Sequence, residues 1–475
     1  MNNSEFRKHA HELADWMADY IENIHRYPVK PDIKPGDIKS RLPSKASDTE
    51  ESFENIFSDF KNIILPGMTH WQHPEFFAYF PTGASEPSIL AEMLSSVLGA
   101  QCMIWLTSPS AEELEERMME WLRDMIGLPD SFIGVIQDSS SSATLVSLLT
   151  ARESKTDFQI NKSGFTGKEK FRIYTSDQAH SSVDKDVRIA GFGSDNLIKI
   201  DSDDNFAMIP DKLEAAVKSD TEKGYSPFCV VSTIGTTSST AIDPVYDISL
   251  ICKKYKMWHH IDASYSGTAL ILPEYRWMSK GAELADSFVF NPHKWMFVNF
   301  DCSAYFVRDK KSLINTFSVT PEYLKTPEDK LVNNYRDWGI PLGRKFRALK
   351  LWFVIRNYGV KGLQEKIRNH ISFGQWFKEQ VISEKYFELM APVPLNLVCF
   401  RINPGGVQDE DRLEIINSEL LKSLNDSGKI LLTHTKLNGK YVIRFVAGQN
   451  HVSHDNVKEG WNLIKQKADE LLKQF

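Results

Sequence analysis

The chain has 475 residues, of which 42% are hydrophobic and 25% are charged, and its formal net charge is −7. This composition is typical of a globular protein with a large core and room for two or three domains. Acidic residues outnumber basic ones, and the sequence contains no block of basic residues. Both features argue against a nucleic-acid-binding surface. No apolar run is long enough to span a membrane, and the first residues lack a signal-peptide core.

The five cysteines are scattered along the chain and show no paired spacing. Their odd number and apolar surroundings indicate reduced, buried thiols, which predicts a cytoplasmic protein. The histidines show no zinc-binding spacing, so no metal site is expected.

The N-terminal part is predicted to be helical. Apolar residues recur at spacings of three and four over 5–25, and a second helix is expected over about 52–65. These helices lie outside any α/β pattern, so their apolar faces must be buried on something else. A partner subunit is one option.

The segment 71–82, WQHPEFFAYFPT, is unusually aromatic for a stretch that holds two prolines. It is equally consistent with an extended core segment and with the wall of a pocket for a flat ligand, because aromatic faces give stacking area at low entropy cost. Helices are then expected over 87–99 and 111–127, the second with acidic residues in its first turn.

From about residue 130 the pattern changes to alternating strands and helices. Strands are predicted at 132–136, 171–175, 197–200, 228–234 and 257–262. This alternation predicts an α/β fold with a mostly parallel central sheet and helices on both faces. Ligands of such sheets bind beyond the carboxyl ends of the strands.

The first of these strands is followed by a turn of small polar residues, Asp138 to Ser142, and by a helix over 143–153. A strand, a small polar turn and a helix N-terminus form an anion site, because free backbone amides point outward and hydroxyls add donors. Ordinary capping by serine is the alternative, although four serines exceed what capping needs.

Polar residues also follow other strands, and each alone could be a cap or turn residue. Their shared position at the strand ends favours a single site. The set comprises Ser139 to Ser141, His180, Thr236, Thr237, Asp262 and Lys294.

Lys294 lies in the motif NPHKW, between the apolar runs 287–290 and 295–298, which are predicted to be buried strands. Burial disfavours the ammonium form and lowers its pKa. An amine with a lowered pKa is the nucleophile that forms a Schiff base with an aldehyde cofactor. Taken alone, Lys294 is more simply a strand-end lysine that reaches solvent.

Together, these features predict pyridoxal phosphate as the cofactor. It needs an imine-forming lysine, a phosphate cradle and an acid that keeps the pyridine nitrogen protonated. Asp262, at the end of a hydrophobic strand, suits the last task, and His180 could offer a face for the ring.

After about residue 350 the pattern is that of a small α+β domain with antiparallel strands. It includes a long helix from 341 or 342 to 358, a second over about 361–380, a strand at 396–402, a hairpin of 430–435 and 441–446 around Asn438-Gly439, and a final helix over 454–473. The expected parts of the chain are therefore an N-terminal helical dimerisation segment (1–85), a large cofactor-binding α/β domain (86–350) and a small C-terminal domain (351–475).

Several motifs resemble those of the group II pyridoxal-phosphate-dependent amino-acid decarboxylases, and most closely the aromatic-L-amino-acid decarboxylase branch. They are NPHKW, DQAHSS at 177–182, IDASYSG at 261–267, STIGTT at 232–237 and WQHPEFFAYFPT. The resemblance runs almost end to end. It implies a fold-type I enzyme that forms a homodimer with its active sites at the subunit interface.

The resemblance also implies residue roles. The catalytic residues would be Lys294, Tyr323, His180 and Asp262, with Tyr323 on a mobile loop that protonates Cα after carbon dioxide leaves. The cofactor would be bound by Ser140, Ser141, His180, Thr237, Asp262, Asn291, His293 and Lys294. The substrate pocket would be lined by Trp71, Tyr79, Phe80, Thr82, Gln101, Met103 and Gly343.

The implied reaction is decarboxylation of Trp, dopa, Tyr or Phe to the amine. Gly343 leaves room for a bulky ring, and the presence of Tyr323 and His180 favours plain decarboxylation. An aldehyde synthase, which also oxidatively deaminates, and a decarboxylase of a non-aromatic amino acid are the alternatives. Ser264, Asp138, Gln101 and Met103 depart from the pattern of many relatives.

Overall fold

The computed structural model describes residues 1–319 and 326–473, so Tyr323 lies outside the described residues. The chain forms two compact units. Unit 1 consists of Met1–Pro81, Trp376–Met390 and Cys399–Phe475, and unit 2 of Thr82–Gln375 and Ala391–Val398. The division at residues 85 and 350 stays a prediction.

Unit 2 is built on a seven-stranded sheet of order β1-β7-β6-β5-β4-β2-β3. Strands β2 to β6 pair in parallel, whereas β7 is antiparallel to both β1 and β6. The predicted α/β fold with a mostly parallel sheet is confirmed. The strands are β1 (Ile133–Gln137), β2 (Phe171–Ser176), β3 (Leu197–Ile200), β4 (Ser226–Thr233), β5 (Trp258–Asp262), β6 (Ser287–Phe290) and β7 (Ser303–Val307).

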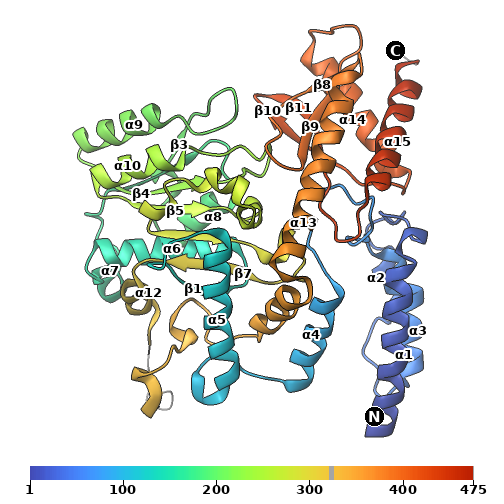
Figure 1. Cartoon of the computed structure of the whole chain (residues 1–475), viewed down its shortest axis with the longest axis horizontal. Coiled ribbons are helices and arrows are strands. Elements are labelled where there is room, and N and C mark those ends of the chain that lie inside the picture. Colours follow the sequence, from blue (N-terminus) through green and yellow to red (C-terminus); the bar gives the residue numbers. More distant parts are fainter. Residues whose placement is uncertain (320–325, 474–475) are drawn as a thin grey trace. The chain divides into compact units, whose positions relative to one another are not determined.

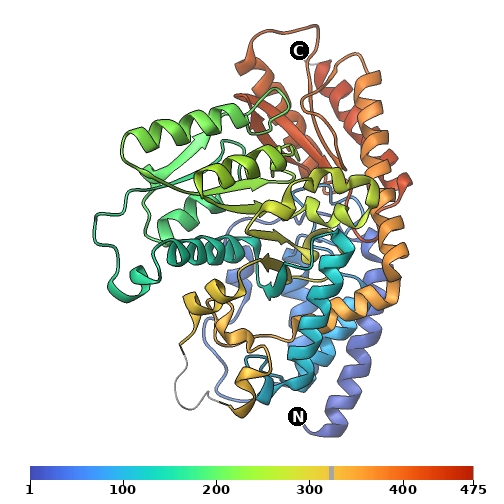
Figure 2. The ribbon, with the colours of Figure 1, turned by 60° about the vertical axis from the view of Figure 1, so that its left-hand side comes forward.

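Helices cover both faces of this sheet. On one face, α6 (Ser140–Lys155) and α8 (Ser182–Ile189) pack on alternate strand residues such as Ile173 and Val231. On the other, α9 (Pro210–Glu222) and α10 (Val245–Tyr255) pack on Tyr174 and Val230. Figure 1 labels these helices, and Figure 2 shows teal α6 and the green helices α9 and α10 on opposite sides of the strands. The two-sided burial explains why these strands are apolar throughout.

The remaining helices of unit 2 flank the sheet. They are α4 (Glu86–Leu98), α5 (Pro109–Ile126), α7 (Gln159–Ser163), α11 (Pro292–Trp295), α12 (Lys310–Phe317) and α13 (Arg347–Ser383), of which α13 continues into unit 1. The predicted break after residue 358 is confirmed, because Gly359 has φ 64° and ψ 166° within α13.

Two sequence predictions in this unit are wrong. The helix expected from 341 or 342 begins only at Arg347, because the preceding turn pairs with another segment: the Arg344 amide donates to the Gln101 side chain. The run 295–298 is not a strand. Lys294 lies in the short helix α11, and the chain then turns at Phe297, which has φ 60°.

Unit 1 combines the two ends of the chain. Its N-terminal helices are α1 (Asn3–Glu22), α2 (Asp37–Arg41) and α3 (Phe53–Asp59), the last extended by a π-helical turn over Phe60–Ile64. Its sheet has the order β10-β11-β9-β8, and α14 (Glu410–Asp426) and α15 (His454–Leu472) belong to the same unit. The strands are β8 (Phe387–Leu389), β9 (Leu397–Ile402), β10 (Thr433–Leu437) and β11 (Lys440–Val446).

The hairpin turn at Asn438-Gly439 is present, but its first strand begins at Thr433 rather than at residue 430. Leu431 instead forms a parallel bridge with Phe76. Phe76 and Phe77 are fully buried, and the Phe77 ring lies 4.3 Å from that of Phe445. Part of the aromatic segment 71–82 therefore packs in the core, in agreement with the interpretation of this segment as an extended core segment.

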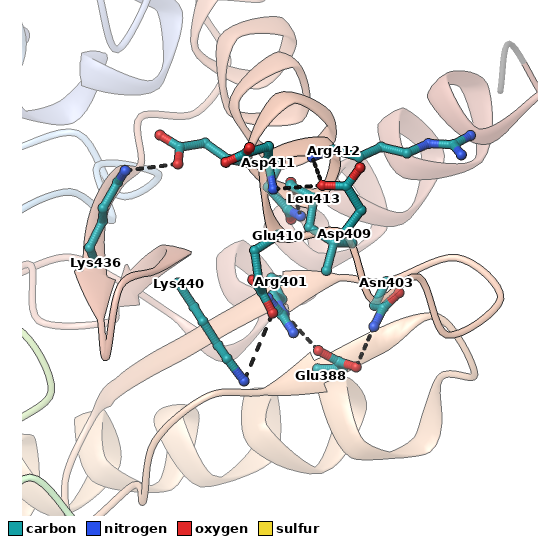
Figure 3. Close-up of polar contacts among 12 residues, drawn as sticks. Glu388, Arg401, Asn403, Asp409, Glu410, Asp411, Arg412, Leu413, Lys436 and Lys440 are labelled. Carbon is teal, nitrogen blue, oxygen red and sulfur yellow. Dashed lines mark hydrogen bonds and ion pairs between the residues drawn. The ribbon is translucent and has the colours of Figure 1, made fainter.

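A polar network joins α14 to the sheet of unit 1 (Figure 3). Arg401 of β9 is buried and donates to Glu388 at 2.6 Å and to Glu410 at 2.7 Å. Asn403 donates to the other oxygen of Glu388 at 2.8 Å. These hydrogen bonds satisfy a guanidinium that would otherwise be buried unpaired.

No helix in the described part of the chain is both long and apolar enough to cross a bilayer.

Candidate active site

Asn291 is the residue at which the predicted site elements meet. It follows β6, and its side-chain oxygen accepts hydrogen bonds from Ser140 at 2.6 Å and from Ser303 at 2.5 Å. Its amide donates to the Ser264 carbonyl at 2.9 Å, and its carbonyl accepts from the Lys294 amide at 3.0 Å. The turns after β1, β5 and β6 are thereby joined at one edge of the sheet.

Lys294 has the electrostatic setting expected of a reactive amine. Desolvation by the surrounding protein lowers the pKa of its ammonium group, and the Asp262 carboxylate opposes this shift. Desolvation is the larger effect, so the environment favours the neutral amine over the ammonium form while a counter-charge stays close.

His180 lies in the loop after β2, and its ring is exposed. Its Nδ1 accepts a hydrogen bond from the Ser182 amide at 3.1 Å, so the proton of the neutral ring is on Nε2. Desolvation lowers the pKa of His180; Asp262 raises it and Lys294 lowers it. The structure thus brings His180 within electrostatic reach of both residues.

Asp262 ends β5 and is buried, with 5% of its surface exposed. Its Oδ1 accepts hydrogen bonds from the amide of Ser264, at 3.0 Å, and from the Ser264 hydroxyl. Ser264, named above as a departure from the pattern of relatives, therefore orients the carboxylate. Sequence reasoning recognised the departure but not this contact.

The turn after β1 both caps a helix and presents further donors. Ser139 is the N-cap of α6, and its side chain accepts from the Ser142 amide at 3.2 Å. Ser140 is buried and donates to Asn291, while Ser141 is partly exposed and Asp138 is exposed. The helix N-terminus beside these hydroxyls suits an anion.

The segment that begins with Thr82 lies against the Lys294 turn. The Gly83 amide donates to the Lys294 carbonyl at 3.2 Å, and the Ser85 hydroxyl donates to the Phe297 carbonyl at 2.7 Å. A Cβ on Gly83 would lie 2.9 Å from the Phe297 backbone. Only glycine allows this close approach.

His293 is buried beside Lys294, and its Nδ1 accepts from the Cys302 amide at 2.9 Å. Desolvation, with a further contribution from Lys294, lowers its pKa to about 3. His293 is therefore neutral at physiological pH and offers an anion no positive charge.

Thr237 lies in the loop after β4 and is exposed. Gly235, two residues before it, has φ 85°, and a Cβ there would lie 1.8 Å from the Ser266 hydroxyl. This loop is tied to β5 because the Ile234 amide donates to the Asp262 carbonyl at 2.9 Å.

Three predicted substrate-lining residues form a second group in unit 2. Gln101 pairs with the turn that contains Gly343, since the Arg344 amide donates to Gln101 Oε1 at 2.6 Å. Met103 pairs with an earlier turn, where the Arg336 amide donates to the Met103 carbonyl at 3.0 Å. A Cβ on Gly343 would lie 3.1 Å from Gln101 Nε2.

Of the other four predicted lining residues, Thr82 begins unit 2 and the remaining three belong to unit 1. Trp71 stacks on Tyr79 with ring centroids 5.7 Å apart, and the Arg444 guanidinium lies 5.4 Å from the Phe80 ring. Tyr79 is 54% exposed and has φ 54°. These residues present aromatic surface on unit 1.

Three serines contribute to the geometry without having been predicted to do so: Ser303 binds Asn291, Ser182 selects the His180 tautomer, and Ser264 orients Asp262. Ser182 and Ser264 lie inside two of the motifs quoted above and act on residues two positions away, whereas Ser303 lies in no quoted motif and meets Asn291 only because β7 pairs with β6.

Comparison with known proteins gives a consistent result. A model of the pyridoxal-dependent decarboxylase conserved domain matches residues 35–403. The chain is 43% identical to an aromatic-L-amino-acid decarboxylase of Cavia porcellus, covering 100% of this chain and 99% of the relative. It is 42% identical to a phenylacetaldehyde synthase of Arabidopsis thaliana, covering 99% and 97%. The crystal structure of Oryza sativa TDC with PLP and tryptamine superposes with a TM-score of 0.96 at 34% identity, covering 99% of both chains.

Proposed function

Because the chain belongs to the pyridoxal-dependent decarboxylase family, we propose that it converts an aromatic L-amino acid to the corresponding amine and carbon dioxide. The substrate class is Trp, dopa, Tyr or Phe. The observation that supports this proposal most directly is the desolvated Lys294, which interacts electrostatically with Asp262 and His180. These residues lie at the edge of the sheet where Asn291 links the turns that follow β1, β5 and β6.

The residues present fit pyridoxal phosphate. The cofactor carries an aldehyde, a phosphate and a pyridine ring, and the edge offers an amine of lowered pKa in Lys294, a helix N-terminus with the Ser140 hydroxyl, and the carboxylate of Asp262. When bound, pyridoxal phosphate supplies a conjugated ring that accepts the electron pair of the bond to the departing carboxylate.

Each protein group then has a task. Lys294 supplies the amine that holds the cofactor and afterwards displaces the product. Asp262, oriented by Ser264, holds a proton on the pyridine nitrogen. His180, with its proton on Nε2, stacks on the ring. Ser140, Ser141 and Asn291 bind the phosphate.

The rest of the site serves the substrate. Thr82 contacts the substrate carboxylate and Thr237 lies near the ring substituents. The pocket is walled by Trp71, Tyr79, Phe80, Gln101, Met103 and Gly343, and Tyr323 protonates Cα after carbon dioxide leaves. We further propose a homodimer with the sites at its interface, located in the cytoplasm. The five cysteines are all buried and none forms a disulfide, which is compatible with a reducing compartment.

The proposal is tested first with the purified protein and Lys294→Ala. We expect visible absorption from bound pyridoxal phosphate in the unmodified protein, and loss of both this absorption and amine formation in the variant. Lys366→Ala is a matched control, since desolvation also lowers the pKa of Lys366. A colourless protein that does not respond to added pyridoxal phosphate contradicts the proposal.

A second candidate is an aldehyde synthase, because the chain is also 42% identical to a phenylacetaldehyde synthase. Incubation with Phe, Tyr, dopa and Trp, and with His and Glu as non-aromatic controls, distinguishes the two by the amounts of amine, aldehyde and peroxide. We expect the amine from aromatic substrates. Mainly aldehyde would support the second candidate, and turnover of only His or Glu would refute the aromatic assignment.

Tyr323→Phe tests the proton donor. If Tyr323 delivers the proton to Cα, removing its hydroxyl shifts the product from amine toward aldehyde. Product ratios are measured at equal substrate consumption. An unchanged ratio would mean that another group is the donor.

A further inference from the structure

Two segments of unit 2 that are far apart in the sequence are hydrogen-bonded to each other. The Arg344 amide donates to Gln101 Oε1 at 2.6 Å, and the Cys102 amide donates to the Arg344 carbonyl at 3.0 Å. The Arg336 amide donates to the Met103 carbonyl at 3.0 Å. The segment 101–103 is thus held by the segment that leads into α13.

The side chain of Arg344 anchors this arrangement in the core. It is 5% exposed, and its Nη2 donates to the Glu115 carboxylate at 2.5 Å and to the Ile136 carbonyl at 3.1 Å. Glu115 is 3% exposed and also accepts from the Ile136 amide at 2.8 Å. One ion pair therefore fastens the 343–344 turn to both α5 and the end of β1.

Glu115 is the carboxylate that balances Arg344. Glu112, one turn earlier on α5, is also buried, but desolvation and the nearby Glu115 raise its pKa to about 8 despite the opposing effect of Arg344. Glu112 is thus uncharged at neutral pH and does not replace Glu115. Removal of one partner of a buried pair leaves the other unpaired and is strongly destabilising locally.

The anchored turn also determines where the Gln101 side chain can lie. Its Oε1 is fixed by the Arg344 amide, and its Nε2 lies 3.1 Å from the position that a Cβ on Gly343 would occupy. If the turn moves, Gln101 loses its hydrogen bond and Gly343 no longer faces it.

We propose that Arg344 and Glu115 form a positioning pair that holds Gln101 against Gly343 and so sets which aromatic ring the enzyme accepts. The inference rests on the proposed function, because the lining roles of Gln101 and Gly343 belong to it. Neither Arg344 nor Glu115 is assigned a contact with substrate or cofactor.

The first test follows the segments directly and needs no catalysis. Glu115→Gln keeps the shape of the side chain but removes its charge. Arg344→Lys keeps the positive charge, but an ammonium group cannot reproduce the planar guanidinium that donates to both Glu115 and the Ile136 carbonyl. We expect hydrogen–deuterium exchange at Cys102 and Arg344 to rise about tenfold in Glu115→Gln and less in Arg344→Lys.

Glu153→Gln is the matched control. Glu153 is fully buried, pairs with Arg152 at 2.8 Å and accepts from the Asn161 amide at 3.0 Å, at the far end of α6. We expect this variant to leave exchange in 101–103 and 343–344 unchanged. If Glu115→Gln also leaves it unchanged, the positioning role is overturned.

The second test is substrate preference, measured as the ratio of kcat/KM for Trp to that for Phe, with kcat and KM determined separately. We expect Glu115→Gln to change this ratio about tenfold, mainly through KM. The ratio for Arg344→Lys is expected to lie between those of the unmodified protein and Glu115→Gln. Equal losses for both substrates would mean that the pair is only structural, and would overturn the proposal.

Gln101→Asn keeps the test decisive if Glu115→Gln does not fold. Gln101 is exposed, and shortening its side chain withdraws the acceptor from the Arg344 amide without touching the buried pair. The same change in substrate ratio is expected, and an unchanged ratio would contradict the proposal. If the unmodified protein converts no aromatic amino acid, the proposed function fails, and the claim about substrate specificity fails with it. The hydrogen–deuterium exchange experiment tests the Arg344–Glu115 pair independently of that outcome.

Discussion

Lys294 owes its chemistry to its neighbours rather than to its own position in a motif. Burial lowers the pKa of its ammonium group, and Asp262 supplies the opposing charge. Asn291 ties its turn to the ends of two other strands. A single lysine between apolar runs could not have been distinguished from one that reaches solvent.

Gly343→Ser is predicted to act through Gln101. The added Cβ would lie 3.1 Å from Gln101 Nε2, so this side chain has to shift. We expect kcat/KM for Trp to fall about tenfold relative to Phe, because the larger ring is the more affected by a narrowed pocket. Steady-state kinetics of Gly343→Ser, Gln101→Ala and the double variant measure this. Strictly additive effects would contradict a contact between the two positions.

Asp186 gives a prediction for pH dependence. It is 3% exposed, and its Oδ2 has no hydrogen-bond partner among the described residues. Desolvation raises its pKa from 3.8 to about 7, with Lys185 opposing and Asp262 adding to the rise. Because the folded-state pKa lies above the unfolded one, stability is lost as the pH rises from about 4 to about 7.

Asp186→Asn removes this loss. We expect the variant to be more stable than the unmodified protein by roughly 2 kcal/mol at pH 8, after allowance for solvent screening, and nearly equal to it at pH 4. Urea unfolding at both pH values measures the difference. Asp184→Asn is the control. Asp184 lies on the same helix, has an exposed side chain and pairs with Lys199, so this variant is expected to show no gain in stability at pH 8. A pH-independent difference for Asp186→Asn would contradict the assignment.

At the scale of elements, α13 illustrates how a local residue interrupts a helix. Gly359 has φ 64° and ψ 166°, a conformation open almost only to glycine, and a Cβ added there would meet no neighbouring atom within 4 Å. The sequence marked this break because a glycine lies between two apolar helical patterns. It did not mark where the helix begins, since Arg347 follows a turn held by Gln101.

Gly359→Ala is therefore predicted to destabilise the protein by about 2 kcal/mol through backbone strain alone. Gly362→Ala, three residues later, has only an ordinary contact at 3.6 Å with Tyr358, and we expect it to stabilise by about 0.5–1 kcal/mol because alanine favours helix. The free energy of unfolding in urea distinguishes them. A loss of equal size in both variants would show that the strain at Gly359 is not the cause.

At the scale of the whole molecule, the two ends of the chain form a single unit. Phe77, close to the end of the N-terminal part, packs on Phe445, and Phe76 bridges to Leu431. Residues more than three hundred positions apart thus pair in this unit, as the isolated bridge between Phe76 and Leu431 shows. Hydrophobic periodicity along the sequence cannot predict such non-local packing.

Phe77→Ala is predicted to destabilise unit 1 by about 3–5 kcal/mol, because it opens a cavity at a fully buried ring. Phe6→Ala is the control, since Phe6 is 56% exposed, and we expect a change within about 0.5 kcal/mol. Unfolding in urea, followed by far-ultraviolet circular dichroism, measures both. A small effect of Phe77→Ala would mean that the N-terminal part does not support the C-terminal sheet.

The amino-acid sequence by itself determined the alternation of strands and helices, because hydrophobic periodicity and turn residues are local properties. It also determined which polar residues follow the strands, since parallel strands bring their carboxyl ends to one edge. Lys294, Asp262, His180 and Ser140 could therefore be predicted as candidates, whereas Asn291 was implied only by the family resemblance.

The tertiary structure alone decided what surrounds those candidates. Ser303, in β7, and Ser140, just after β1, donate to Asn291 only because the strands meet in one sheet, and the Arg344–Glu115 pair joins positions more than two hundred residues apart. The run 295–298, expected to be a strand, forms a turn instead. The Phe297 carbonyl in this turn accepts from the Ser85 amide and hydroxyl, and the Lys294 carbonyl just before it accepts from the Gly83 amide. Long-range hydrogen bonds of this kind override local propensity, because a buried polar group must be satisfied wherever its partner lies in the chain.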